Sequence, residues 1–467
     1  MATLGALMRK NLAYHQFRRS FCVATKCRPE VTLEESTQHA VETGKYKPRQ
    51  HEGRLVSGCV SVPEQIVNAI LKCCKDYPLK ALLAEGVKLN NFVRSRKVPL
   101  ETDEIRRKII DLRHSVAEDI RGKIDVEKMD EEQLTRVNQA VETQSKKRVK
   151  QHIYAWKPLN YDEYKALQYL LGRSAAEYSV LNRIFDEIKI RDPEFKPRSF
   201  IDFGSGVGTG TWAAANVWKE SIFEYVSVDA SASMNDLAEL VLRGGDMNKA
   251  MTLRNVFYRQ FLSASNTKHS IVLCAFSLFE LPSRKIRLET IENLWNKCDG
   301  YLILVEHGSQ AGFSLIEEAR KFLLAKIESS GNEGHIFSPC PHHQQCPRMA
   351  LQDGTPCNFE STFNPLPLSK GVEANKALYS YIVFHKGSPT QQTRYPRLVR
   401  QTLVRSKHSI CRMCTEDGRL QEIIFTAAKH GKILYRCARA SKWGDQLPIK
   451  IDLKAVDTVS ECTGNVS

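Results

Sequence analysis

The sequence lacks any apolar run long enough to cross a membrane. Its longest apolar stretches, such as the one that begins at Tyr301, end well before the roughly 18 residues that a spanning helix needs. Internal repeats are also absent. The 467 residues, 42% of them hydrophobic and 26% charged, are typical of a globular chain with two or three domains and no membrane span.

Acidic residues are missing from the N-terminus. None precedes Glu30, whereas basic and apolar residues alternate there at roughly helical spacing. An acid-free amphipathic segment with several arginines is typical of a mitochondrial transit peptide. We therefore predict a transit peptide over residues 1–30 and a place in the mitochondrial matrix. A basic N-terminus without a targeting role is the alternative.

A second acid-free stretch lies between Glu373 and Glu416 and carries eight lysines and arginines. The net charge of the whole chain is +15. Such a balance favours a nucleic acid or another polyanion as partner, because clustered cations neutralise phosphates. A solvated basic face is the alternative. The side chains that we predict to contact phosphates are Arg394, Arg397, Arg400, Arg405 and Lys407.

Sequence patterns divide the chain into successive parts. Apolar residues at spacings of three and four predict helices, and strands that alternate with helices predict a parallel sheet covered on both faces. A long helical stretch that ends at Arg191 has an expected break near Gly172, and a β-hairpin is expected to turn in "KHGK". The predicted parts are a flexible linker over 31–62, a helical domain over 63–164, a doubly wound α/β domain over 165–390, a basic β-rich region over 391–452 and a disordered tail over 453–467.

The α/β domain contains the glycine-rich stretch "IDFGSGVGTG" between a predicted strand and a predicted helix. Glycines permit a sharp turn and a close approach of the backbone to a ligand. The next strand ends in Asp229, whose carboxylate can accept hydrogen bonds from ribose hydroxyls, and Asp202 can meet an ammonium group. This frame resembles the class I, Rossmann-like methyltransferases that use S-adenosylmethionine. The predicted cofactor-binding residues are Asp202, Gly204, Gly206, Gly208 and Asp229.

A catalytic motif is missing from the same domain. Amino-group methyltransferases of this class often carry (D/N)-P-P-(Y/F) after the fourth strand, where this chain has "CAFSLFELP". Cys274 has no Pro-Cys context of the kind that a nucleophile for cytosine C5 would have. The sequence therefore predicts a cofactor pocket without recognised catalytic residues, and a loop that no longer binds anything is the alternative.

Fourteen cysteines are present, but a long chain with a matrix-type leader does not predict a disulfide framework. Three of them, with two histidines, lie in an insertion at 335–365 that contains "CPHHQQCPRMALQDGTPC", and a C-x2-C pair follows at Cys411 and Cys414. Thiolates in a proline-rich loop suit an iron–sulfur cluster or a zinc ion, and His342 or His343 can complete a zinc site. The spacing alone does not separate these metals.

Several features in order resemble one known family: "FIDFGSGVGTGTWAA", "LVEHGSQAGF", "CPHHQQCP", "CRMCTEDGRL" and "LYRCARASKWGDQLP". Together they are similar to the mitochondrial small-ribosomal-subunit methyltransferase-like family over roughly residues 150–450. The resemblance implies a class I methyltransferase fold, a mitochondrial location and association with the assembling small ribosomal subunit. It also implies a [4Fe–4S] cluster on Cys340, Cys346, Cys357 and Cys414, with Cys411 as the rival fourth ligand and Cys357 as the least secure of the others.

The resemblance leads us to expect an assembly factor that binds small-subunit rRNA and ribosomal proteins as a monomer. The metal is expected to hold the insertion against the basic C-terminal region. Two alternatives are an active methyltransferase that uses S-adenosylmethionine on rRNA and a cluster-bearing regulator that senses iron–sulfur supply.

Overall fold

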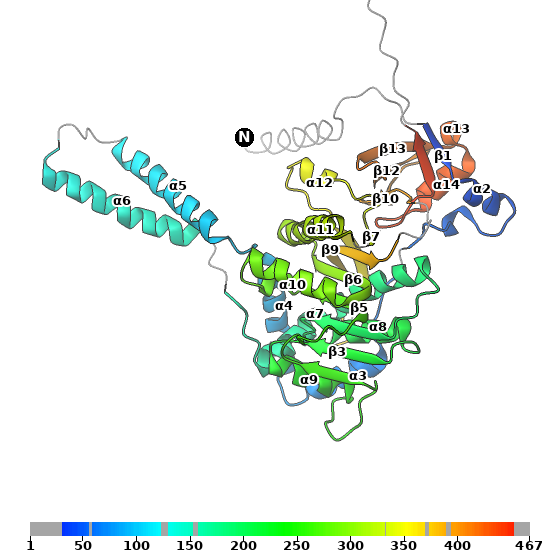
Figure 1. The fold of residues 1–467 in the computed structure, drawn as a ribbon, viewed down its shortest axis with the longest axis horizontal. Coiled ribbons are helices and arrows are strands. Elements are labelled where there is room, and N and C mark those ends of the chain that lie inside the picture. The colour runs from blue at the N-terminus through cyan, green and yellow to red at the C-terminus, as the bar shows by residue number, and fades with distance from the viewer. Residues whose placement is uncertain are drawn as a thin grey trace, which may run out of the picture.

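The computed structural model describes residues 30–55, 58–122, 129–152, 157–331, 333–368, 373–388 and 394–452, so most of the predicted transit peptide and the predicted tail lie outside the described residues. The largest sheet has the order β4-β3-β2-β5-β6-β9-β7, and β8 pairs with β9 (Figure 1). Its first five strands are parallel, and β9 is antiparallel to both of its neighbours β6 and β7. The strands are β2 (Ser199–Phe203), β3 (Glu224–Val228), β4 (Val256–Arg259), β5 (His269–Ala275), β6 (Cys298–His307), β7 (Gly334–Ser338), β8 (Phe359–Phe363) and β9 (Asn375–Lys386).

Strand order reverses between β2 and β5, because β3 and β4 lie on one side of β2 while β5 and β6 lie on the other. In doubly wound sheets ligands bind at the carboxyl ends of the strands at such a switch point. The glycine loop follows β2 at this point, as the sequence predicts. The α/β fold is therefore confirmed, and the strand order places the glycine loop at the switch point of the sheet. The helices that belong to this layer are α8 (Thr209–Trp218), α9 (Ala232–Leu242), α10 (Arg284–Asn296) and α11 (Gln310–Ser330), with a short turn of 3-10 helix at Leu278–Glu280.

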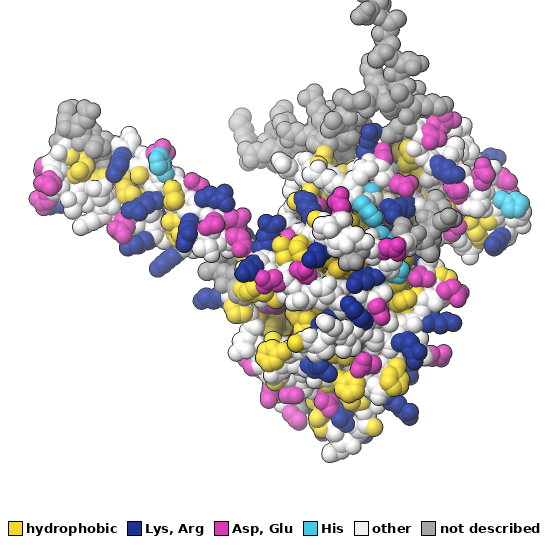
Figure 2. Space-filling model, viewed as in Figure 1, with side chains coloured by type: hydrophobic (Ala, Val, Ile, Leu, Met, Phe, Trp, Pro, Cys, Tyr) yellow, Lys and Arg dark blue, Asp and Glu magenta, His cyan; other side chains and the backbone are white. Residues whose placement is uncertain are grey.

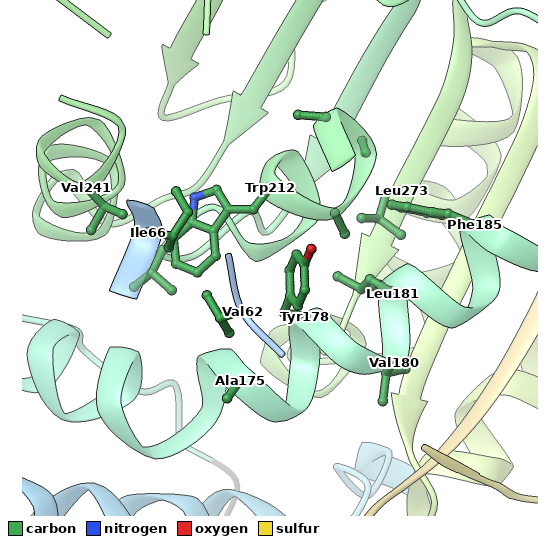
Figure 3. Close-up of a cluster of buried hydrophobic side chains, with 14 of the residues drawn as sticks. Val62, Ile66, Ala175, Tyr178, Val180, Leu181, Phe185, Trp212, Val241 and Leu273 are labelled. Carbon is green, nitrogen blue, oxygen red and sulfur yellow. The ribbon is translucent and has the colours of Figure 1, made fainter. Parts of the chain in front are cut away.

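Helix α7 (Glu163–Arg191) runs through the largest apolar core. Tyr178 and Leu181 of α7 lie in one cluster with Trp212 of α8. Phe185 of α7 lies beside Leu273 of β5, and Ile66 of α3 lies next to Trp212 (Figure 3). The helix is buried along most of its length, which explains why its sequence is apolar beyond a single stripe. The remaining N-terminal helices are α3 (Glu64–Cys73), α4 (Leu79–Ser95), α5 (Thr102–Arg121) and α6 (Glu131–His152).

The predicted break near Gly172 is wrong, since α7 continues through it. A Cβ placed on Gly172 would collide with the backbone of Gly86 in α4, and a Cβ on Gly86 would collide with α7 in return. These two glycines mark the place where the helix axes cross closely, which only residues without side chains permit. The helices α3 and α4 thus pack on the α/β body and do not form a separate domain.

Helices α5 and α6 form a hairpin that projects away from the body (Figure 1). Val116 and Val141 are buried between the two helices, whereas Ile110 is 64% exposed on the outside. Basic and acidic side chains are interspersed over the visible face of the hairpin and of the body (Figure 2). None of the helices among the described residues is long and apolar enough to cross a membrane.

The C-terminal region forms a second, smaller unit around its own apolar core, which includes Leu398, Phe425 and Leu434. Strand β12 pairs with β10, β11 and β13, and a two-stranded sheet of β1 and β14 lies beside them. The elements are β10 (Arg397–Leu398), β11 (Leu403–Val404), β12 (His408–Cys414), β13 (Leu420–Thr426), α13 (Ala427–His430), α14 (Lys432–Ala440) and β14 (Ile449–Asp452), and the insertion adds α12 (Pro347–Ala350).

Two predictions for these segments are wrong. The hairpin expected to turn in "KHGK" is a strand followed by helices, because Leu434, Cys437 and Ala438 recur at helical spacing and bury one face of α14. The linker expected over 31–62 is folded in part: β1 (Glu30–Leu33) pairs with β14, and α2 (Glu35–Glu42) and a 3-10 turn at Pro48–Gln50 follow. Its strand is completed by residues more than 400 positions away, so its own sequence shows no pattern.

Candidate functional site

The glycine loop between β2 and α8 has the shape that its sequence predicts. Gly204, Gly206 and Gly208 have φ values of 71°, 51° and 88°, in the left-handed region that favours glycine. A Cβ on Gly204 would also collide with the side chain of Ser277, which follows β5. The loop therefore depends on these glycines for its conformation as well as for access to a ligand.

Asp229, at the end of β3, is engaged by this loop. Its Oδ2 accepts a hydrogen bond from the backbone N–H of Gly206 at 2.9 Å, and its Oδ1 accepts one from the N–H of Ser231 at 2.9 Å. Burial raises the pKa of its carboxyl, although these two N–H groups act to lower it. Each oxygen that would accept from a ribose hydroxyl thus already accepts from the protein's own backbone.

Asp202 does not lie at the surface of the loop. Its side chain is 2% exposed, and a Cβ on Gly210 in the first turn of α8 would collide with its carboxyl group. Burial, and then the neighbouring charge of Asp229, raises the pKa of Asp202 to about 8. The prediction that it meets a ligand's ammonium group is not supported, because a buried and mostly protonated carboxyl offers neither access nor a full negative charge.

Helix α7 covers the other side of the loop. The ring of Tyr169 would be 3.9 Å from a Cβ on Gly206, and its hydroxyl donates to Glu177 at 2.7 Å. The guanidinium of Arg173 lies between two rings, 5.2 Å from the centre of Tyr169 and 5.5 Å from that of Phe276. An ordered row of side chains from α7 therefore borders the loop.

The catalytic motif of amino-group methyltransferases would follow β5, and no such motif is present there. Phe276 has a φ of 58°, an unusual value for a residue other than glycine, and the polar residue that follows it is Ser277, whose hydroxyl donates to the carbonyl oxygen of Ala275 at 2.8 Å. Glu306 on the neighbouring strand is fully buried and accepts from the N–H of Leu278, and burial raises its pKa to about 8. Its role is that of a buried hydrogen-bonding group beneath the strand ends.

The cysteines of the insertion line one pocket together with a cysteine from the C-terminal unit. Cys340, Cys346 and Cys357 come from the insertion, and Cys414 comes from the end of β12. His342 lines the same pocket and is hydrogen-bonded through Nε2 to the sulfur of Cys414 at 3.3 Å. The fold thus brings together the four cysteines that the resemblance implies.

Strand geometry separates Cys414 from Cys411. Residues an odd number of positions apart on a strand point to opposite faces. Cys411 accordingly faces the apolar core of the C-terminal unit, with its sulfur 3.6 Å from the carbonyl oxygen of Ala438 and 3.8 Å from the hydroxyl of Thr402. Only Cys414 is directed toward the insertion.

The four thiols are buried and affect one another. Burial raises the pKa of Cys340 to about 12, and it raises the pKa values of Cys346, Cys357 and Cys414 as well. After burial, the largest effects on Cys414 are those of the three other thiols, which disfavour a second negative charge nearby. Metal binding at this pocket would have to displace protons from neutral thiols.

Within the part of the chain that the structure describes, no three His, Cys, Asp or Glu side chains stand in an arrangement that could hold a metal ion. The four thiols therefore share a pocket without surrounding one ion. The donor set itself fits a soft metal or an iron–sulfur cluster, since thiolates are the ligands that both prefer. The described cysteines are all unpaired, so none of these sulfurs is taken by a disulfide.

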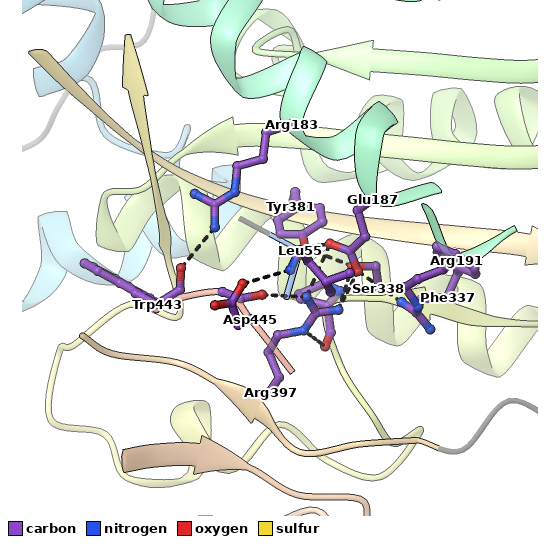
Figure 4. A network of polar contacts seen from close by, with 12 residues as sticks. Leu55, Arg183, Glu187, Arg191, Phe337, Ser338, Tyr381, Arg397, Trp443 and Asp445 are labelled. Carbon is purple, nitrogen blue, oxygen red and sulfur yellow. Dashed lines mark hydrogen bonds and ion pairs between the residues drawn. The ribbon is translucent and has the colours of Figure 1, made fainter. Parts of the chain in front are cut away.

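Arg397, predicted to contact a phosphate, is instead 1% exposed. It forms an ion pair with Glu187 of α7 at 2.5 Å and donates through Nε to the carbonyl oxygen of Pro339, next to Cys340 (Figure 4). Burial acts to raise the pKa of Glu187, but Arg397 and Arg191 outweigh it and lower that pKa to about 2. The prediction for Arg397 is wrong because a cation in a basic stretch can be buried when an acid distant in sequence pairs with it.

The other predicted cations differ in exposure. Arg400 donates to the carbonyl oxygen of Pro356 at 2.9 Å and lines the cysteine pocket, so its guanidinium is bound within the protein. Arg394 is half-buried, whereas Arg405 and Lys407 are exposed. Of the five, only the last two present their full charge to solvent.

Two residues that sequence patterns did not single out hold the insertion in place. Arg320 of α11 donates to the carbonyl oxygens of His342 at 3.2 Å and Gln344 at 2.5 Å. Glu187 of α7 anchors Arg397, which in turn holds Pro339. Both residues belong to long helices that are buried over much of their length, and a charged residue buried on such a helix requires a partner.

Comparison with known proteins gives a consistent result along the chain. The family model described as "Mitochondrial small ribosomal subunit Rsm22" matches residues 163–448. The human protein "Ribosome assembly protein METTL17, mitochondrial" is 35% identical over 405 residues, which cover 86% of each chain. The Schizosaccharomyces pombe protein "Rsm22-cox11 tandem protein 2, mitochondrial" is 26% identical over 358 residues, which cover 64% of this chain and 45% of that protein.

The solved structures that match part of the chain include methyltransferases. Magnesium protoporphyrin IX methyltransferase from Synechocystis PCC 6803, with bound S-adenosylmethionine, is 14% identical with a TM-score of 0.30 and covers 50% of this chain and 88% of its own. An S-adenosylmethionine-dependent methyltransferase from Clostridium acetobutylicum is 10% identical with a TM-score of 0.27 and covers 59% of this chain and 86% of its own.

Proposed function

The chain belongs to the Rsm22 family of mitochondrial small ribosomal subunit proteins, and from this premise we propose that it is an assembly factor of that subunit. The protein is mitochondrial, and its place of action is the matrix, where the subunit is assembled. Its partners are small-subunit rRNA and ribosomal proteins, and it acts as a monomer on the subunit. The observation that carries the proposal is the family match, which takes in both the glycine loop and the cysteine pocket.

We further propose that the cysteine pocket holds a [4Fe–4S] cluster on Cys340, Cys346, Cys357 and Cys414. Four thiols from two segments that are distant in sequence line this pocket, together with Arg348 and Arg400, whose charges would offset those of the thiolates. The cluster would join the insertion to the C-terminal unit and so stabilise both. A zinc ion with His342 as one ligand is the alternative, and His342 has a buried Nδ1 atom without a partner.

The RNA contact of this proposal rests on the exposed part of the basic stretch. Arg405 and Lys407 lie between β11 and β12, and Arg394 lies before β10. The carbonyl oxygen of Arg405 accepts a hydrogen bond from Arg439 of α14, which fixes the shape of this turn. Side chains held in this way at the surface of the C-terminal unit would contact phosphates at fixed positions.

The alternative function is an active methyltransferase that uses S-adenosylmethionine. The conformation of Gly204, Gly206 and Gly208 supports binding of this cofactor by backbone groups. Phe276 and Ser277 stand where the catalytic motif would have its Asp or Asn, which disfavours catalysis. We therefore propose that the methyltransferase-like domain serves mainly as a scaffold.

The test of this proposal has two measurements on one preparation. Protein purified without oxygen should contain iron and acid-labile sulfide in equal amounts, about four of each per chain. It should also co-sediment with small ribosomal subunits from mitochondria that lack it. One zinc without sulfide would replace the cluster by a zinc site, and a failure to co-sediment would overturn the assembly function whatever the metal.

A further inference from the structure

A pocket of about 520 Å³ opens between α4, α7 and the ends of β6 and β9. Its volume is in the range of sites that bind molecules of the size of a nucleotide. Its walls are apolar side chains such as Leu83, Leu171 and Leu366, and its lining includes Phe276 and His307 at the ends of β5 and β6. The four cysteines of the cysteine pocket and the three glycines of the glycine loop do not belong to this lining.

This pocket is separated from the glycine loop by a wall of side chains. Tyr169 lies against the loop, Arg173 lies against Tyr169, and Phe276 lies on the other side of Arg173. Arg173 is held rigidly, because Glu177 accepts from its Nε at 2.8 Å and Asn90 accepts from its Nη1 at 3.1 Å. The buried ion pair of Arg173 and Glu177 thus lines the pocket on the side of Tyr169, the residue that borders the glycine loop.

The inner end of the pocket combines an aromatic ring with an unsatisfied polar atom. The rings of Phe276 and His307 are 5.3 Å apart at an angle of 47°, and both line the pocket. The Nε2 atom of His307 is buried and has no hydrogen-bond partner. A buried polar atom without a partner is costly, so this atom indicates a place where a ligand atom donates or accepts a hydrogen bond.

The outer end of the pocket is polar and carries cations. Arg94 and Asn91 are exposed on α4, and Lys376, which pairs with Glu360 at 2.9 Å, belongs to β9. All three groups line the pocket, and Arg94 is near enough to His307 for its charge to help lower the pKa of that imidazole, after burial and Arg173. A ligand with a flat, hydrogen-bonding ring at one end and a phosphate at the other would match this distribution, since rings stack on aromatic faces and phosphates prefer Arg and Lys.

We propose that this pocket binds one unpaired nucleotide of an RNA strand, with the base against Phe276 and His307 and the phosphate near Arg94. The inference rests on the proposed function, because it assumes an RNA partner. Tyr169 and Arg173 stand between the proposed base site and the glycine loop. The pocket would therefore hold the base without placing it beside a methyl donor. Nucleotide binding is thus independent of the glycine loop.

The test titrates the full-length protein with the four nucleoside 5′-monophosphates by isothermal calorimetry. At least one should bind saturably in the millimolar range or tighter. Val87 lines the pocket, lies on α4 and is 57% exposed, so Val87→Trp should fold normally, narrow the pocket and weaken binding at least tenfold. Ala81→Trp, at an exposed position of the same helix outside the pocket, is the matched control and should bind as the wild type does.

Three outcomes would overturn the inference: no binding of any monophosphate, unchanged binding by Val87→Trp, or displacement of the nucleotide by S-adenosylmethionine. Asp229→Asn should leave nucleotide binding unchanged, because Asp229 lies on the other side of the wall. Co-sedimentation with ribosomal subunits is scored separately. If the protein binds subunits but no monophosphate, only the nucleotide-binding proposal is refuted. If it binds monophosphates but no subunits, the assembly function is refuted.

Discussion

The glycine loop and the cysteine pocket are built in opposite ways. The loop is local: its three glycines lie within five residues, and Asp229 reaches it from the adjacent strand. The pocket is assembled from an insertion and from β12 of the C-terminal unit, which are separated in sequence by β9 and by much of the basic stretch. The glycine loop keeps its shape through its own backbone conformation. The cysteine pocket depends on the contacts that hold the insertion against the C-terminal unit.

The polar groups of the two sites differ accordingly. The carboxylate of Asp229 accepts hydrogen bonds from the backbone around it, although the buried hydroxyl of Ser205 in the same loop has no partner. The thiols of the cysteine pocket are buried with raised pKa values, and His342 beside them keeps an unpartnered Nδ1 atom. A buried polar atom without a partner indicates a place where a ligand could bind, and each of the two sites contains one. Because only the cysteine pocket joins two units of the chain, we propose that it is the working site and that the loop belongs to the scaffold.

The largest effect is expected from removing one thiol. Cys414→Ser should abolish the iron content of the anaerobically purified protein, because a cluster needs each of its ligands in place. Cys411→Ser is the matched control from the same strand and should keep its iron, since Cys411 faces the apolar core. Iron analysis of the folded monomer measures both. Retention in Cys414→Ser with loss in Cys411→Ser would reverse the assignment.

The second effect concerns the buried ion pair that joins α7 to the C-terminal unit. Arg397→Ala should lower the free energy of unfolding by about 3–5 kcal/mol, because it leaves Glu187 buried without its main partner. Arg405→Ala, at an exposed position of the same stretch, should change it by less than about 0.5 kcal/mol. Urea unfolding at pH 7 measures both values, and equal losses would show that the pair does not bind the two units together.

This pair also predicts a dependence on pH. The pKa of Glu187 is lowered to about 2 in the folded protein, so its contribution to stability is full above its unfolded pKa near 4.5. The contribution is lost as the pH falls from that value through 2. Acid unfolding of Arg397→Ala should therefore be less steep in this window than that of the wild type.

The third effect lies in the glycine-loop half and has the opposite sign. The pKa of Asp202 is raised to about 8, so the folded protein holds a proton that the unfolded chain loses near pH 4. The wild type is therefore destabilised as the pH rises from 4 to 8. Asp202→Asn, which stays neutral, should unfold at the same temperature as the wild type near pH 4 and be the more stable of the two proteins at pH 8. Parallel pH profiles would contradict the buried, protonated state.

The smallest effect concerns the exposed cations. Replacing Arg405 and Lys407 with alanine should weaken rRNA binding several-fold and lower the salt slope of the affinity by about 0.7–0.9 for each phosphate that is no longer neutralised. Lys196→Ala, an exposed change on the α/β body, should leave the slope unchanged. Filter binding at several salt concentrations measures both. A slope that stays the same in the double variant would place the RNA surface elsewhere.

Sequence patterns predicted most of the α/β domain because its signals are local. The strands around "IDFG" and "YLILVEHG" and the glycine conformations follow from apolar runs and turn chemistry within short windows. The burial of Arg397 does not follow from a short window of sequence, since its partner Glu187 lies 210 positions away. The pairing of β1 with β14 could not be predicted for the same reason, because the two strands are distant in sequence. Cys414, in contrast, was identified by family resemblance, and the reason for preferring it over Cys411 became visible only in the strand.

The central claim is that the cysteine pocket does the work and the glycine loop supports it. The most direct test expresses variants in cells that lack the protein and measures mature small mitochondrial ribosomal subunits on sucrose gradients. Asp229→Ala should restore the subunit to wild-type amounts, and Cys414→Ser should not, with both proteins present at equal levels in the matrix. Restoration by Cys414→Ser, together with failure of Asp229→Ala, would contradict the account and identify the glycine loop as the working site.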